Sequence, residues 1–207
     1  LGDSDTGIRL LANTTLATAN GALDLDGAIT GDGSNDTLTL NAGTGANALI
    51  TSAESITGIT TLTITNSGGA TFDKAVNTSV SVVLTDTDAG DDIIFGNANG
   101  GDLTTVTLTV AAQDFDIAIL EDATITQATS FDNTGTLTLG SATQTGGGAA
   151  DELTFTGGLV ATDQSNTATS IQLAGTIATT NTAMQLGDSD TGIRLLANTT
   201  LNTSGAG

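Results

Sequence analysis

The chain has 207 residues, of which 23 are acidic and 3 are basic, giving a net charge of −20 at neutral pH. With only Arg9, Lys74 and Arg194 to neutralise phosphate groups, we expect neither nucleic-acid binding nor attachment to anionic membranes. The sequence contains no run of about 18 apolar residues, so we expect no membrane insertion. It also lacks cysteine and histidine, which removes disulfides, thiol chemistry and the commonest general base.

Short alternations of threonine with aliphatic residues predict β-strands that have one buried face. In chain order they are Thr37–Leu40, Thr61–Ile64, Val80–Val82, Thr105–Val110, Thr136–Leu139, Leu153–Phe155 and Ile171–Leu173. The threonine side chains lie on the opposite face, where they are expected to form ladders between neighbouring strands. Clusters of Gly, Asn, Asp and Ser separate the runs and predict turns, and no segment has the apolar period of a convincing helix.

The string LGDSDTGIRLLANTTL occurs twice, at residues 1–16 and again at 186–201. Self-similarity at a fixed offset is typical of repeat architectures. We therefore divide the chain into one repeat unit, 1–185, and the start of the next, 186–207. In the first copy we expect Asp3 and Asp5 in a turn, with Ile8 and Leu10 facing inward. The second copy is expected to have the same backbone as the first, displaced along one axis.

The spacing of the predicted strands favours a parallel β-solenoid. Leu62 follows Leu38 by 24 residues and Val106 follows Leu84 by 22. At about 20 to 24 residues per coil, a 185-residue unit has roughly eight or nine coils and a length of about 40 Å. The alternative is a tandem pair of β-sandwich modules, which the absence of tryptophan and tyrosine disfavours.

The phrases TLTITNSGGATFDKAV (61–76), NTGTLTLGS (133–141), ELTFTGGLVAT (152–162) and GTIATTNTAMQLGD (175–188) resemble the giant β-strand-repeat surface proteins of bacteria. Those chains are similar in style to filamentous-haemagglutinin-type adhesins and S-layer-like proteins. The resemblance covers most of the chain and implies a secreted, extracellular structural or adhesive protein. It carries no catalytic residues to this sequence.

Three segments are similar to the calcium-binding β-roll nonapeptide, in which a turn carboxylate precedes a core residue. They span 31–38, 90–97 and 146–153 and place Asp36, Asp92 and Asp151 at the ligand position. Asp32 and Asp102 are further candidate ligands. A β-roll has consecutive nonapeptides that share each ion, whereas these matches are isolated. Acidic turns that bind no calcium are therefore the alternative.

The two arginines occupy the same position of the duplicated string and lie near four aspartates in sequence. The residues concerned are Asp3, Asp5, Arg9, Asp188, Asp190 and Arg194. One interpretation is a local surface ion pair, worth about 0–1 kcal/mol. The other is a contact between successive units that fixes their register.

These observations predict an extracellular structural protein that polymerises with itself, or continues in tandem, into a filament, sheath or stalk. The alternative is an adhesin stalk that presents its turns to carbohydrate or to a neighbouring cell surface. We do not expect an enzyme, because the chain offers few cations and no histidine or aromatic platform for a carbohydrate substrate.

Overall fold

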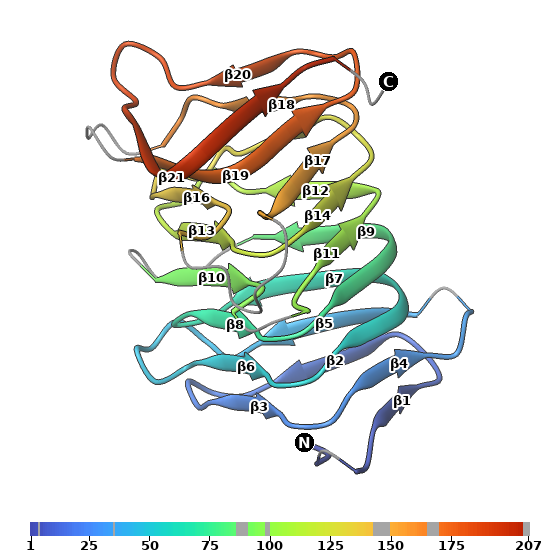
Figure 1. The fold of residues 1–207 in the computed structure, drawn as a ribbon. Coiled ribbons are helices and arrows are strands. Elements are labelled where there is room, and N and C mark those ends of the chain that lie inside the picture. The colour runs from blue at the N-terminus through green and yellow to red at the C-terminus, as the bar shows by residue number, and fades with distance from the viewer. Residues whose placement is uncertain are drawn as a thin grey trace.

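The protein is a parallel β-solenoid whose short strands stack along one axis (Figure 1). The computed structural model describes residues 1–3, 5–34, 36–85, 91–97, 100–142, 150–164 and 170–204. The described residues contain no helix, and so none that is long and apolar enough to cross a membrane. The predicted all-β solenoid is thus confirmed, and the tandem β-sandwich alternative is wrong.

Each turn of the solenoid visits three faces in the same order. Face 1 contains β1 (Ile8–Leu10), β4 (Ile29–Gly31), the starts of β7 (Ile56–Asn66) and β9 (Val76–Leu84), β11 (Leu103–Thr105), β14 (Ala123–Ile125), β17 (Glu152–Phe155) and the ends of β19 (Ile171–Thr179) and β21 (Ile193–Asn202). Face 2 contains β2 (Thr14–Ala17), β5 (Thr37–Asn41), the ends of β7 and β9, and β12 (Thr107–Val110), followed by the separate three-stranded sheet of β15 (Thr129–Ser130), β18 (Leu159–Ala161) and β20 (Met184–Leu186). Face 3 contains β3 (Leu23–Leu25), β6 (Ile50–Ser52), β8 (Ala70–Phe72), β10 (Asp92–Phe95), β13 (Asp116–Ile119), β16 (Leu137–Leu139) and the starts of β19 and β21.

The 185-residue unit has about seven complete turns, slightly below the eight or nine expected. The register shows the reason. Ile50 pairs with Ala70 after 20 residues, but Leu137 pairs with Ile171 only after 34. Turns that carry long connections use up chain without adding a strand to any face, so uniform spacing overestimates the number of coils.

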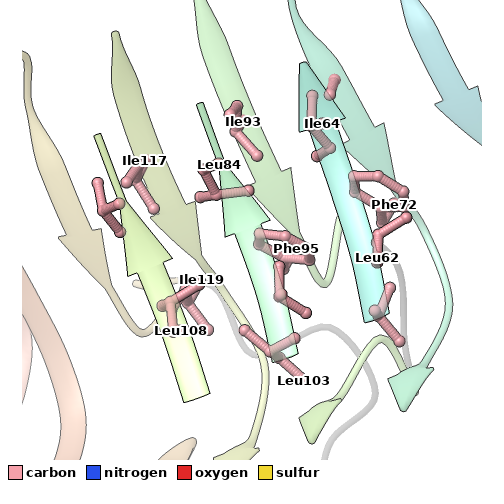
Figure 2. Packing of buried hydrophobic residues seen from close by; sticks show 14 of the residues in the cluster. Leu62, Ile64, Phe72, Leu84, Ile93, Phe95, Leu103, Leu108, Ile117 and Ile119 are labelled. Carbon is pink, nitrogen blue, oxygen red and sulfur yellow. The ribbon is translucent and has the colours of Figure 1, made fainter. Parts of the chain in front are cut away.

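The core is a column of aliphatic and aromatic side chains enclosed by the three faces. Figure 2 shows Leu62, Leu84 and Leu108 of face 2 pointing toward residues of face 3. All five phenylalanines are buried, and the rings of Phe72 and Phe95 on adjacent turns stack with centroids 5.1 Å apart. Each coil therefore covers its neighbours, and stability depends on stacking rather than on one central core.

Most strand threonines lie on the outer side as predicted, but some face inward. The hydroxyl of Thr78 donates to that of Thr105 at 2.8 Å, and both residues are buried. This pair connects adjacent turns of face 1. A hydrogen bond of this kind offsets the cost of placing two hydroxyl groups in an apolar interior.

The two copies of the duplicated string do not occupy equivalent places, so simple displacement along the axis is wrong. In the first copy, Ile8–Leu10 lies on face 1 and Thr14–Ala17 on face 2. In the second, the strand segment starting at Ile193 lies on face 3 and the segment starting at Thr199 on face 1. The offset of 185 residues thus corresponds to seven turns and two further faces, not to a whole number of turns.

Candidate functional site

The turn after β4 brings together two of the predicted metal ligands, Asp32 and Asp36. The Asp36 carboxylate accepts a hydrogen bond from the Asp32 backbone N–H at 2.9 Å and is buried. Asp32 in turn accepts hydrogen bonds from the backbone and the hydroxyl of Ser34. These bonds lower the pKa of Asp32, and the charge of Arg9 lowers it further. Both carboxylates therefore close the turn by accepting from its own backbone.

Asp92 lies on face 3 at the start of β10, directly in register with Asp116 of β13. Partial desolvation raises the pKa of Asp92, and the nearby Asp116 and Asp91 carboxylates raise it further. Asp116 also accepts from the backbone N–H of Thr136 on the next turn at 2.5 Å. Beside Asp92 is a shallow hollow of about 220 Å³ that Leu49, Thr71 and other residues line.

A column of carboxylates runs along the edge of face 1, where its strands begin. Because Leu103 pairs with Ala123 and Ala123 with Leu153, the preceding residues Asp102, Asp122 and Glu152 lie on successive turns. Partial desolvation raises the pKa of Asp102, and the Asp122 charge raises it further. Asp122 accepts from the Glu152 backbone N–H at 2.8 Å. We call these three residues the acidic column.

Asp151 lies next to the acidic column but turns its carboxylate away toward the backbone. It accepts from the Ser141 N–H at 2.7 Å and is 6% exposed. Its burial raises its pKa, the bond from Ser141 acts in the opposite sense, and Asp122 adds to the rise. Asp151 is thus a turn-closing residue of the same kind as Asp36.

The five predicted metal ligands therefore occupy three separate places: the β4 turn, the start of β10 and the neighbourhood of Asp122. Among the described residues, no three acidic side chains form a group that would hold a metal ion. Gly90 and the glycines at 146–148, which belong to two of the nonapeptide matches, lie outside the described residues. Asp116 and Asp122 were not predicted, because their roles depend on the register between turns, which the sequence does not reveal.

The residues expected at a contact between units form local turns at opposite ends of the solenoid. Asp3 accepts from the Asp5 N–H at 3.1 Å, and Asp188 accepts from Asp190 and Thr191 at 2.9 Å each. A hydroxyl bond from Thr6, followed by the bond from Asp5, lowers the pKa of Asp3, and the bonds from Asp190 and Thr191 lower the pKa of Asp188. Arg9 is exposed, and its positive charge lowers the pKa of Asp32, which lies outside the duplicated string. Arg194 lies in register with Gln172.

The last strand, β21, exposes side chains that belong to the core. Leu195 is 63% exposed although its register partner Leu173 is fully buried. Ile193 and Leu201 are also exposed, although their register partners Ile171 and Ile177 are buried. We call Ile193, Leu195 and Leu201 the apolar edge. The duplicated string is the sequence signal for the apolar edge, because its second copy, residues 186–201, contains all three residues.

Comparisons with protein-family models, with curated proteins and with solved structures find no match to this chain.

Proposed function

We propose that this chain is a structural unit of an extracellular filament, sheath or stalk, built by stacking or tandem continuation of solenoid units. The observation that carries the proposal is the apolar edge of β21. Its three aliphatic side chains lie in the core ladder and have no coil above them within the described chain. A further coil placed on this edge would bury them.

The duplicated string provides an internal comparison for this edge. Leu10 and Leu195 are the same position of the string, and Leu10 is only 4% exposed whereas Leu195 is 63% exposed. Each of the two strands pairs with a neighbouring coil on one side, β1 with β4 and β21 with β19, and only the second copy leaves this leucine exposed. In the proposal, the coil that follows the second copy covers Leu195.

The backbone of the edge supports the same proposal. Strand β21 pairs along one side with β19 through seven register positions. The groups on its other side point along the axis, where a parallel strand of a following coil continues the ladder. An uncovered edge of this kind tends to recruit another strand. Because the unit spans seven turns and two faces, the next unit continues the solenoid rotated by one face.

The extracellular part of the proposal is supported by composition and by the resemblance described above. The surface is acidic, cysteine is absent and strand ladders dominate. The long secreted repeat chains that this sequence resembles are likewise rich in short threonine-containing strands.

Cysteine labelling tests the proposal directly, since the chain has no native cysteine. Leu195→Cys is introduced into the single chain and into a longer chain in which residues 17–207 follow Leu201. The thiol of Leu195→Cys should react rapidly in the single chain and be protected in the longer one. Val80→Cys, which is 50% exposed on the side of the solenoid, should react equally in both.

Equal labelling of Leu195→Cys in the two chains would contradict the proposal, provided that circular dichroism shows both to be folded. A second readout is negative-stain microscopy of the long chain. We expect rods whose axial length grows by about 37 Å per unit, from the spacing between strands. Beads joined by flexible linkers would contradict continuous stacking.

A further inference from the structure

The outer side of face 2 carries a two-dimensional array of threonines on five stacked strands, β2, β5, β7, β9 and β12. One column follows the register between turns through Thr15, Thr39, Thr63, Val83 and Thr109. The second column, two residues earlier on each strand, contains Thr37, Thr61, Ser81 and Thr107. We call these nine residues the threonine array. Figure 1 shows the five strands one above another along the axis.

The array has a regular spacing in both directions. Successive turns are about 4.8 Å apart, and alternate residues of one strand are about 6.7 Å apart. Five strands give the array a length of about 19 Å. The residues that alternate with it, among them Leu38, Leu62 and Leu108, are buried in the core. The array is therefore held on a rigid, hydrogen-bonded sheet.

The chemistry of the array differs from that of the surrounding surface. None of its nine positions carries a charge, although the chain has a net charge of −20. The Thr61 and Ser81 hydroxyls lie 3.0 Å apart and bond to each other. The hydroxyls of Thr39, Thr63 and Thr109 bond to no other described residue. The surface is a repeated pattern of hydroxyl and methyl groups.

We propose that the threonine array binds the surface of ice. The spacing between turns is close to the shorter oxygen repeat on the prism plane of hexagonal ice, and the spacing along a strand is somewhat below the longer repeat. Hydroxyl groups at those spacings can occupy oxygen positions of the lattice, while the adjacent methyl groups sit over its hollows. Because the side chains are already ordered on stacked strands, little conformational entropy is lost on binding. A charged side chain would instead hold liquid-like hydration at the surface.

Face 1 provides an internal contrast. Its outer side also has a column of threonines, which includes Thr104 and Thr124 in register. Two residues earlier in the chain lie Asp102 and Asp122 of the acidic column. On the turns of β11, β14 and β17, face 1 therefore has one threonine column beside a row of charges. The proposal assigns ice binding to face 2 and not to face 1, and it does not depend on filament formation.

The proposal is tested by ice recrystallisation and thermal hysteresis with the purified monomeric fraction. We expect the native chain to inhibit recrystallisation and to depress the freezing point below the melting point, relative to serum albumin at equal mass. Thr39→Lys combined with Thr63→Lys, at the centre of the array, should abolish both effects. The matched pair Thr104→Lys and Thr124→Lys on face 1 should retain them.

Circular dichroism and melting temperatures establish that both pairs of variants are folded. Single variants Thr39→Val and Thr63→Val, which keep the shape and the methyl groups, should lose only part of the activity. Native protein with no activity above albumin would overturn the proposal, as would equal loss in the two lysine pairs. Retention on microcrystalline cellulose or chitin in place of ice, lost with Thr39→Lys and Thr63→Lys, would also overturn it and reassign the face to a polysaccharide.

Discussion

Asp92 lies directly opposite Asp116 in the parallel ladder of face 3, so two carboxylates occupy one position on adjacent turns. Like charges placed opposite each other in a sheet are destabilising. Asp102 and Asp122 repeat the arrangement at the edge of face 1. The folded chain therefore holds charges closer together than the unfolded chain does.

This arrangement predicts that the protein is more stable at mildly acidic pH than at neutral pH. The pKa values of Asp92, Asp102 and Asp151 are raised above the ordinary value of 3.8. A raised pKa means that the folded state binds more protons, so the stabilisation is present at low pH and is lost as the pH rises through the folded pKa. Melting temperatures should therefore be higher near pH 4.5 than at pH 7.5.

When the pH falls below the ordinary aspartate pKa of 3.8, a further decrease in pH lowers the stability of the folded state. Asp3, Asp32 and Asp188 have lowered pKa values, so the stability they contribute is lost as they become protonated. These three side chains are exposed, so solvent screens their contribution. The Asp92→Asn variant should melt higher than the native chain at neutral pH, with a smaller pH dependence. A melting temperature that rises steadily from pH 4.5 to 7.5 would contradict this account.

Calcium should stabilise the fold by screening the charges of the acidic column, although these carboxylates are not grouped as a metal site among the described residues. Asp102, Asp122 and Glu152 follow one another on successive turns, and a divalent cation near them offsets their mutual repulsion. We expect calcium to raise the melting temperature and chelator to reverse the rise. The effect should exceed that of sodium chloride at equal ionic strength. Asp122→Asn should reduce it, whereas Asp5→Asn, in an exposed turn, should leave it intact. An unchanged melting temperature in the native chain would count against calcium binding here.

The sequence predicted the fold well because strand alternation survives in the structure. Thr37–Leu40 lies within β5, and Ile171–Leu173 begins β19. Thr105–Val110 was predicted as one strand, but it divides into β11 and β12 because the chain passes from face 1 to face 2 at Val106. Alternation records which side of a strand is buried, but not where the chain turns a corner.

The candidate site was harder to predict because it depends on register between turns. Asp92 and Asp116 are 24 residues apart, and Asp122 and Glu152 are 30 apart. Each pair is brought together by the length of the chain segment that connects its two strands, and this length differs from one turn to the next. For the same reason the two copies of the duplicated string lie on different faces. Connection lengths are set by turn residues whose conformations the strand pattern does not determine.

Replacing Phe72 by alanine should destabilise the solenoid strongly. Phe72 is fully buried and stacks on Phe95 with an angle of 9° between the ring planes. Removing a buried aromatic side chain costs about 3–5 kcal/mol, because the cavity left behind closes only partly. The matched control is Thr71→Ala, at the adjacent outward-facing position of β8, which should change the free energy of unfolding by less than about 0.5 kcal/mol. Urea denaturation measures both, and equal costs would contradict the stacked-core description.

Gly140 and Gly33 form a matched pair that separates backbone strain from a steric clash between turns. Both have positive φ, 80° and 88°, a conformation that costs an L-residue about 1–2 kcal/mol. A Cβ atom at Gly33 would meet nothing within 4 Å, whereas at Gly140 it would lie 2.1 Å from the carbonyl oxygen of Ala174 on the next turn.

Gly33→Ala should therefore lower the free energy of unfolding by about 1–2 kcal/mol, the strain alone. Gly140→Ala should lower it considerably more, because the backbone of β19 must move away and its pairing with β16 is disturbed. Urea denaturation compares the two variants, and hydrogen exchange locates the change, which should be concentrated in β16 and β19. Equal losses for the two variants would show that the turns are not packed as closely at Gly140 as this structure has them.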